Sequence, residues 1–460
     1  MASQLSALDA AHIDSISDAA DEPSWLRRYR HDSLSAYVRL PTETSPLYNK
    51  YTHVARMDPH TISLSNGSLG RTPEFLSDRL ADLSGQAHVL QVGTRVVISG
   101  EMPDGVVVSS IDAALRENPD LVRRALEASE SSEDRFTALN NAAFNTGVFI
   151  HVSRNTVLEK PIHVVTSLPE ENLSIISRNV IYMDSNSSGT IVQELYSPPG
   201  GQAYLELLNT NVSEGAHLDV TTLQMMDQSS YNFSTRRTGL ASNSTVNWYL
   251  GLFGTTLSRY RIGYHLNGSG SSVNDSEVVF GSEGQSFDIQ ANMVHNHPAT
   301  EGRITEKSIL RGRSRSLFKG MIRINENAAK SNSYLSGRSI LLDRQSKSDA
   351  IPGLEILTND VKATHSASVA QIDEEQIFYL MCRCLGKTEA ERTIIEGFLE
   401  PLSRKMSSQI RAWIAYLIES KWEGRPLSIN NDEELRKFVE VEETRYNENA
   451  EIEQHYKYRR

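Results

Sequence analysis

The chain is poor in cysteine, with only Cys382 and Cys384 among 460 residues. Two thiols cannot supply the four ligands that a closed metal site takes from one chain. The two cysteines lie one residue apart in a helical pattern, where positions i and i+2 point in different directions. We therefore expect two small, half-buried side chains in a reducing compartment, and no metal site or disulfide built from this chain alone.

Long apolar runs are also missing. No stretch approaches the roughly 18 apolar residues that a membrane-spanning helix needs. Residues Met1 to Glu22 carry Asp9, Asp14, Asp18 and Asp21 and lack the apolar centre of a secretory signal. These absences predict a cytoplasmic protein that does not bind membranes.

Several catalytic and binding motifs are absent. The phosphate-binding pattern G-x-x-x-x-G-K-S/T does not occur, so the chain is not a P-loop ATPase. The hydrolase pattern G-x-S-x-G is absent too, and its nearest approach, Gly270 to Asn274, lacks the final glycine. The net charge of −12 lacks the basic excess of a nucleic-acid-binding protein.

The composition between about Asn141 and Ser368 is typical of β-structure. Lysine and glutamate become rarer there, and serine, asparagine, threonine, valine, isoleucine and tyrosine prevail. The expected strands are Gly147–Val152, Pro161–Thr166, Val180–Asp184, Thr190–Tyr196, Ala216–Met226, Thr245–Phe253, Glu277–Phe280, Phe287–Met293, Ser316–Ile324 and Ser339–Leu342. Turn residues cluster at Gly215, Asn243, Gly268, Glu283, Gly312 and Asn327, at intervals close to one or two multiples of a short period. Such a period fits a solenoid of stacked β-coils, and a two-sheet sandwich fits it as well.

Helical patterns flank this region on both sides. In the N-terminal part we expect helices over Leu5–Ala20, from Pro23 onward, and over Ala113–Ala128 with Asp112 as cap, beside strands Val89–Ser99 and Gly105–Ser110. In the C-terminal part, Asp373 and Gln376 resemble a capping box. Further helices are expected over Thr388–Leu402, Met406–Trp422 and Asp432–Asn449. The sequence thus divides into a mixed α/β region (1–140), a β-rich core (141–370) and an α-helical C-terminal domain (371–460).

One segment carries a specific resemblance. Residues 351–380, from Ile351-Pro352-Gly353 through His365 to Leu380, are similar to the C-terminal signature of the SufB/SufD family, the scaffold proteins of Suf iron–sulfur cluster assembly. That signature usually reads like PGLEI-ANDVRCTHGATVGQIDEEQLFYL. The opening Glu22-Pro23-Ser24-Trp25-Leu26, followed by Leu40-Pro41, is similar to the N-termini of the same family.

The resemblance implies a fold and a set of partners. Members of this family have a right-handed parallel β-helix core, which favours the solenoid over the sandwich. The implied function is that of a non-catalytic scaffold subunit that pairs with a SufB-like subunit. The helical C-terminal domain would dock a SufC-like ABC-type ATPase. No cofactor would be bound permanently, but a transient iron–sulfur cluster would form at the interface with SufB.

His365 is the candidate site residue. An imidazole can ligate borderline metals, although a lone histidine is more often a structural hydrogen-bonding group. In SufD, the histidine of this motif lies at the interface with SufB, and the resemblance implies that His365 contributes to cluster assembly and shares a metal with the partner. The usual cysteine of the motif is Ala363 here, and the usual glycine is Ser366. SufB members carry a cysteine in the preceding strand and a glutamate after the histidine; both are missing, so the chain is most similar to SufD.

Two further segments are weaker candidates. His295 and His297 lie at i and i+2, so on one strand they would face the same side and could chelate a divalent ion, or form hydrogen bonds along the solenoid. Arg311 to Gly320 is a small basic cluster whose common role is a solvated, salt-bridged face.

The alternatives to a scaffold are of two kinds. A β-helix polysaccharide lyase or hydrolase would place several acidic and basic side chains on one solenoid face, and the expected strands are sparse in carboxylates. A homodimeric member of the SufB/SufD family without a direct role in cluster assembly is the milder alternative.

Overall fold

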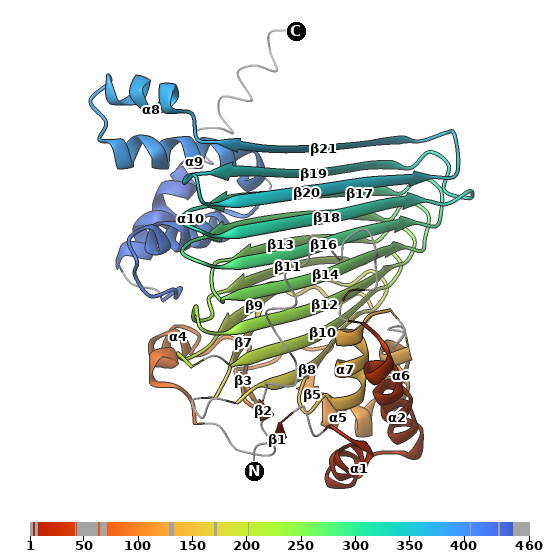
Figure 1. Cartoon of the computed structure of the whole chain (residues 1–460). Helices are drawn as coiled ribbons and strands as arrows, with labels where there is room; N and C mark the ends of the chain where they lie inside the picture. Colours follow the sequence, from red (N-terminus) through yellow and green to blue (C-terminus); the bar gives the residue numbers. More distant parts are fainter. Residues whose placement is uncertain are drawn as a thin grey trace.

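The computed structural model describes residues 3–4, 8–41, 43, 63–64, 71–127, 133–169, 173–200, 202–404, 406–430 and 433–444. Its centre is a parallel β-solenoid in which two long sheets face each other, as Figure 1 shows. The predicted solenoid is confirmed. Mixed α/β structure lies at its N-terminal end and helices lie beside its C-terminal end.

Successive strands alternate between the two sheets. The nine-stranded sheet contains, in spatial order, β20 (Lys347–Ile356), β18 (Arg315–Ile324), β16 (Ser286–His295), β14 (Leu257–Leu266), β12 (Tyr231–Leu240), β10 (Ala203–Val212), β8 (Ile175–Met183), β6 (Val148–Val152) and β5 (Val106–Ser110). The ten-stranded sheet contains β21 (Lys362–Gln371), β19 (Asn332–Leu341), β17 (Glu301–Leu310), β15 (Ser272–Gly281), β13 (Thr245–Leu252), β11 (His217–Gln224), β9 (Ser188–Tyr196), β7 (Ile162–Ser167), β3 (His88–Val92) and β4 (Arg95–Ser99). A two-residue pair, β1 (Ser3–Gln4) and β2 (Ser63–Leu64), lies apart from both sheets.

The coils stack in register. Tyr231 pairs with Leu257 and Arg315 pairs with Lys347, so paired positions lie between 26 and 32 residues apart in the sequence. Parallel pairing of this kind satisfies the backbone of each coil only through its neighbours, so no coil is stable alone. The turns fall where the sequence predicts them. Gly215, for example, has a φ of +68°, a conformation that glycine adopts without steric cost.

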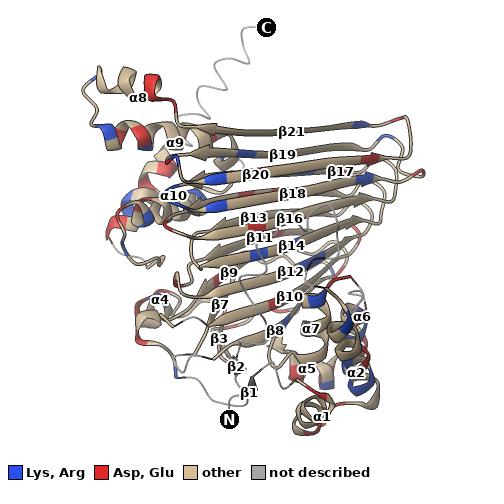
Figure 2. Cartoon of the chain, viewed as in Figure 1, with Lys and Arg blue, Asp and Glu red and all other residues tan. Residues whose placement is uncertain are grey.

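Inward-facing side chains form columns along the solenoid. Val220, Trp248, Asp275, Ile304 and Leu335 follow one another in adjacent coils, and all five are buried. Most columns are apolar and build one continuous core between the sheets. Figure 2 shows the consequence for charge: Lys, Arg, Asp and Glu are sparse over the strands and dense over the terminal helices.

The N-terminal helices cover the outer face of the nine-stranded sheet. These are α1 (Ala10–Ala19), α2 (Ser24–Arg39), α5 (Ile111–Glu117), α6 (Pro119–Glu127) and α7 (Arg135–Ala143), while η4 (Glu74–Leu76) and α4 (Ser77–Asp82) lie toward the other sheet. Arg30 of α2 is fully buried, pairs with Glu22, and donates to the carbonyls of Ala142 and Phe144 at the end of α7.

The C-terminal helices pack on the ten-stranded sheet. They are α9 (Lys387–Ser403), α10 (Ser408–Trp422) and the helical residues 433–444, while α8 (Glu374–Met381) packs against α9 and projects beyond β21. Lys421 of α10 is buried; its Nζ donates to the carbonyls of Phe253 and Phe280 and to Oε1 of Gln285. Arg79 of α4 reaches the same sheet and pairs with the buried Glu194 (Nη2 to Oε1, 2.5 Å). These contacts fix both flanking regions to the solenoid.

Some sequence-based boundaries are wrong. The expected strand Val89–Ser99 is the hairpin of β3 and β4, which turns at Gly93. The expected helix Ala113–Ala128 is two helices, because Pro119 lacks the N–H that would continue α5, and the cap is Ser110 in place of Asp112. The expected helix Leu5–Ala20 begins at Ala10, after the cap Asp9, and its residues 5–7 lie outside the described residues. Residues Tyr456–Arg460 at the other end of the chain also lie outside them.

Strands β10, β12, β14 and β17 are among those without a counterpart in the expected list. In β10, β12 and β17, polar or charged residues occupy inward positions, among them Glu206, Arg236 and Glu306, and they hide the alternation of apolar and polar residues. Glu206 is held by Arg236 (Nη2 to Oε2, 3.2 Å). The expectation that the strands are sparse in carboxylates is therefore wrong for the interior.

Inward carboxylic acids also lie close together in β15 and β17. They are Asp275, Glu277 and Glu306. Burial raises the pKa of Asp275 to about 7 and that of Glu306 to about 8. Burial, and next the charge of Asp275, raise the pKa of Glu277 well above its usual value. In the folded protein these groups therefore keep their protons at pH values at which exposed carboxyl groups are already ionised.

We predict that Glu306→Gln makes the protein more stable at alkaline pH than the unchanged chain. The folded pKa of Glu306 lies above the unfolded value, so the folded state holds an extra proton between about pH 4.5 and 8 and stability falls as pH rises through this window. Each pH unit accounts for about 1 kcal/mol. Urea denaturation from pH 5 to 9 should show a flatter profile for Glu306→Gln. The exposed Glu301 on the same strand is the control: Glu301→Gln should keep the original profile, and equal profiles for all three proteins would contradict the prediction.

Candidate functional site at the C-terminal end of the solenoid

The solenoid ends in two long, open strands. β20 and β21 are the last strands of their sheets, and each has ten residues. Within the described part of the chain, no strand pairs with the outer edge of either one. Their backbone donors and acceptors along that edge are available to another chain, which makes this end of the molecule a template for β-pairing.

His365 lies in the middle of β21. It pairs in register with Leu335 of β19, an inward-facing residue that is fully buried. Side chains of in-register parallel neighbours point to the same face of a sheet. The imidazole of His365 therefore points to the interior side of the solenoid, yet it is exposed because no coil lies above it. The expected role of His365 in cluster assembly stays a prediction.

The surroundings of His365 are partly apolar. Ala363 is partly buried against the solenoid core, and Leu354 of β20 packs there too, whereas Val369 is 42% exposed. On the outward face, Ser366 donates to Ser336 (3.0 Å) and contacts the hydroxyl of Tyr334 (3.4 Å). Hydrogen bonds from Ser336 and Ser366 lower the pKa of Tyr334. The interior of the solenoid thus continues up to β20 and β21, and no further strand of the described residues covers this end.

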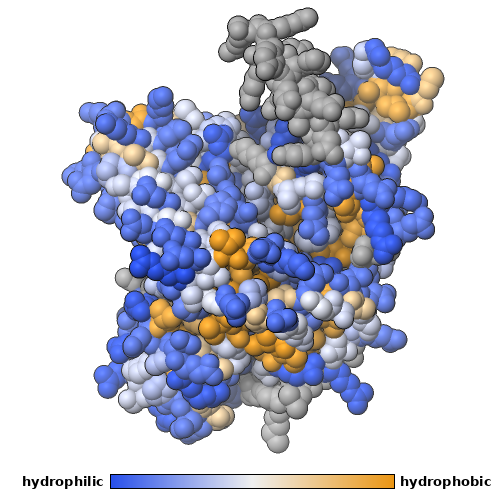
Figure 3. Space-filling model, turned by 180° about the vertical axis from the view of Figure 1, so that it is seen from behind, coloured by the Kyte–Doolittle hydropathy of each residue, from blue (hydrophilic) through white to orange (hydrophobic). Residues whose placement is uncertain are grey.

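Helix α8 extends the apolar surface beyond β21. Its N-cap is Asp373, whose carboxylate accepts from the N–H of Glu375, as the capping-box pattern suggested. Phe378 and Tyr379 are 68% and 57% exposed, and Met381 is exposed too. Figure 3 shows apolar side chains over this helix, at the upper right. Large apolar side chains gathered on one exposed helix mark a protein–protein contact surface.

The two cysteine side chains are more exposed than the sequence predicts. Both Cys382 and Cys384 are exposed, so the expectation of half-buried side chains is wrong. Cys382 is the C-cap of α8, and Cys384 has a φ of +69°, so the helical pattern ends before both. Over the described ranges, no group of three or more His, Cys, Asp or Glu side chains is arranged to hold a metal ion.

The histidine pair is not a chelating site. Strand β16 ends at His295, and His297 lies exposed in the following turn, so the two rings do not share a strand face. His295 is fully buried between Thr300 (Nδ1 to Oγ1, 2.7 Å) and Ser333 (Nε2 to Oγ, 3.0 Å). Burial lowers its pKa to about 4, so the ring is neutral at physiological pH. Of the two alternatives that the sequence left open, hydrogen bonding holds for His295, and the two rings are not placed to chelate one ion.

The basic cluster is divided between two environments. Arg311 lies in a turn with its guanidinium over the ring of Trp422 (5.3 Å). Lys319 is buried and pairs with Asp288 (3.0 Å) and Glu43 (3.5 Å). Lys319 therefore departs from the predicted solvated face, because the residue that forms ion pairs is buried.

Comparison with known proteins agrees with this geometry. Residues 165–398 match the SufBD core domain of SUF-system iron–sulfur cluster assembly proteins, and residues 93–164 match the SufBD N-terminal region. The chain belongs to the SufBD family of iron–sulfur cluster assembly proteins.

Curated relatives cover almost the whole chain. It is 28% identical over 431 residues to an iron–sulfur cluster assembly SufBD family protein of Staphylococcus epidermidis, and 28% identical over 432 residues to one of Staphylococcus saprophyticus. A third, from Staphylococcus haemolyticus, is 27% identical over 431 residues. Each of these alignments spans 90% of this chain and 92% of the relative. Among the described residues, no helix is both long and apolar enough to cross a membrane.

We predict that His295→Ala destabilises the protein by about 2 to 3 kcal/mol, because it leaves a cavity and deprives the hydroxyls of Thr300 and Ser333 of a partner. His297→Ala, in the exposed turn, should change the free energy of unfolding by less than about 0.5 kcal/mol. Urea denaturation measures both. Zinc should not raise the denaturation midpoint of the unchanged protein, and a midpoint that rises with zinc and depends on both histidines would restore the chelating pair.

Proposed function

We propose that this chain is a SufD-like scaffold subunit, without catalytic activity of its own, that works in the cytoplasm. It pairs with a SufB-like subunit through the open end of the solenoid and with a SufC-like ABC-type ATPase through its C-terminal helices. A cluster is assembled transiently at the pairing surface, with His365 as this chain's contribution. The chain binds no nucleic acid and no membrane.

The observation that carries this proposal is the position of His365 on an unpaired edge. The imidazole points to the side of β21 that would face the interior if another coil were added. A partner solenoid that stacked on β20 and β21 would bury the backbone edge and enclose the ring at the junction. A metal ligand at such a junction is accessible while the subunits are apart and shielded from water when they are together.

Family membership and ligand count together support the SufD-like assignment. One imidazole supplies a single ligand, and iron–sulfur clusters take four from their surroundings. Cys382 and Cys384 lie beyond the end of β21, past helix α8, so they are not part of the His365 strand. The remaining ligands would therefore come from the partner subunit.

The helical region supports the ATPase contact. α9 and α10 are fixed to the ten-stranded sheet by a shared apolar core and by Lys421, whereas α8 presents Phe378 and Tyr379 to solvent. A movement applied to α8 would act directly on β21, because only Ile372 and Asp373 separate them. This connection would couple an ATPase to the strand that carries His365.

We predict that His365→Ala leaves the free energy of unfolding and the binding of the SufB-like subunit unchanged but lowers the cluster yield about tenfold, as expected when one metal ligand is lost. Reconstitution with the SufB-like and SufC-like subunits, iron and sulfide, followed by absorption spectroscopy, measures the yield. His297→Ala, which removes another exposed imidazole, is the control. Equal yields from both variants would refute the role of His365.

We predict that Val369→Lys disrupts the pairing, because a charge on the inward side of the edge strand would be buried when another coil is added. Val369 faces the same side of β21 as His365. Size-exclusion chromatography should show loss of the complex with the SufB-like subunit, while binding of the SufC-like ATPase, which uses another surface, is retained. Thr364→Lys, on the outward face of the same strand, should pair normally. If instead Val369→Lys only separates copies of this chain, the protein is a homodimer and the proposed SufB-like partner is wrong.

A further inference from the structure

The two open edges at the C-terminal end of the solenoid differ in one backbone group. β20 contains Pro352, the only proline within the strands that the structure describes. Proline has no N–H, so a sheet tolerates it only at a position where the neighbouring strand needs no donor. The hydrogen bonds at the two ends of β20 show on which edge this donor is missing.

The missing donor of Pro352 lies on the open edge. Lys347 donates its N–H to the carbonyl of Ser314 in the coil beneath (3.1 Å). Ten residues later, Leu357 donates to the carbonyl of Ile324 (2.9 Å). Backbone groups of successive strand residues point alternately to the two edges, and β20 pairs with β18 without a bulge. The odd-numbered residues of β20 therefore bond β18, and the even-numbered ones, Pro352 among them, point away from the solenoid.

β21 has a complete open edge. The N–H groups of Lys362 and Ile372 bond the coil beneath (2.9 Å each), so the even-numbered residues of β21 bond β19. Its odd-numbered residues point to the open edge, and none of them is a proline. β21 is also the more accessible strand, since His365 and Ala367 are exposed, whereas residues Ser348 to Leu354 of β20 are half-buried.

Pro352 lies across the end of the solenoid from His365. One coil below, the side chain of Leu335 fills the space over Gly320, where a Cβ would lie 2.9 Å from the Leu335 methyl carbons. Pro352 stacks on Gly320, and His365 stacks on Leu335. The register therefore places the gap in the β20 edge opposite the residue that carries the imidazole.

We propose that the edge strand of the partner pairs with β21 and that Pro352 excludes continuous pairing along β20, which leaves the junction unpaired directly across from His365. A strand laid along β20 would bury a carbonyl opposite Pro352 without a donor, a cost that β21 does not impose. The identity of the partner as a SufB-like subunit rests on the proposed function, whereas the choice of edge rests only on the backbone of this chain.

Two proline substitutions at facing positions test the choice of edge. Ala350 of β20 stacks on Phe318, and Ala367 of β21 stacks on Gly337. The ring of Phe318 fills the space beside Gly337, so the two alanines also lie across from each other. Both N–H groups point to the open edge, so neither Ala350→Pro nor Ala367→Pro removes a hydrogen bond within the solenoid.

Calorimetric titration with the SufB-like subunit measures the affinity of each variant. Ala367→Pro should weaken binding about tenfold or more, as expected when a buried carbonyl of the partner loses its donor. Ala350→Pro should bind like the unchanged protein. Equal weakening by both variants would show that both edges pair and would overturn the proposal, as would binding that neither variant weakens.

A double variant tests whether Pro352 is the reason. Pro352→Ala supplies the missing donor on β20, so its combination with Ala367→Pro should recover part of the lost affinity. An affinity equal to that of Ala367→Pro alone would show that Pro352 does not decide which edge pairs.

Hydrogen–deuterium exchange on the unchanged complex decides the matter if Ala367→Pro fails to fold. Complex formation should slow exchange at the N–H groups of His365 and Ala367 and leave those of Ala350 and Leu354 unchanged; the reverse pattern would contradict the proposal. If the chain pairs with a copy of itself, the proposed SufB-like partner is wrong, but the same comparison on the homodimer still decides which edge pairs.

Discussion

The parallel, in-register stacking of coils is the constraint on which this protein depends. Each strand obtains its backbone hydrogen bonds from the coils before and after it, so the positions of all side chains follow from the register of one pair. Columns such as Val220, Trp248 and Asp275 exist because the repeat length changes only slightly between coils. The same register places His365 above Leu335 and so decides which way the imidazole points.

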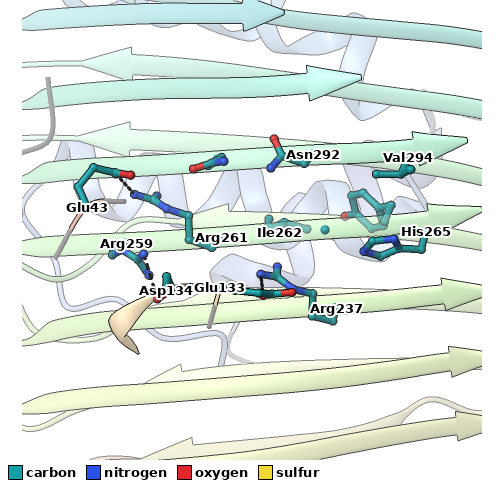
Figure 4. Close-up of a pocket in the computed structure, with 13 residues that line it drawn as sticks. Glu43, Glu133, Asp134, Arg237, Arg259, Arg261, Ile262, His265, Asn292 and Val294 are labelled. Atoms are coloured by element: carbon teal, nitrogen blue, oxygen red, sulfur yellow. Dashed lines mark hydrogen bonds and ion pairs between the residues drawn. The ribbon is translucent and has the colours of Figure 1, made fainter. Parts of the chain in front are cut away.

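Charges are tolerated in this architecture where two elements meet. Arg30 joins α2 to the end of α7, Arg79 joins α4 to the solenoid, and Lys421 joins α10 to two strand ends. In each case a long side chain reaches buried acceptors, which replaces lost hydration with hydrogen bonds. Arg259 of β14 (Figure 4) departs from this pattern, since among the described residues its buried Nε and Nη1 have no hydrogen-bond acceptor.

Much of the fold could be predicted from the sequence, because the turn residues are distinctive and recur at regular intervals along the chain. The turn at Gly215 and the helices near Thr388 and Met406 follow from local chemistry alone. Strands such as β12 could not be recognised, since Arg236 occupies an inward position that partners such as Glu206, 30 residues away, make tolerable. His365 was found through a motif, whereas the contact of Arg259 with Asp134 joins segments more than 120 residues apart and leaves no local pattern. Long-range charge pairing is invisible to any reading of neighbouring residues.

The two ends of the solenoid are unlike each other. At the N-terminal end, β4 and β5 have five residues each and run antiparallel to their neighbours, whereas β20 and β21 are full-length and parallel to the coil beneath. A further coil can copy the existing pattern at one end only. Growth by stacking is therefore self-limiting: once two open ends have met, the shortened, reversed strands at the far ends offer no equivalent template. Pairing through the open ends would therefore stop at two solenoids and would not continue into a fibre.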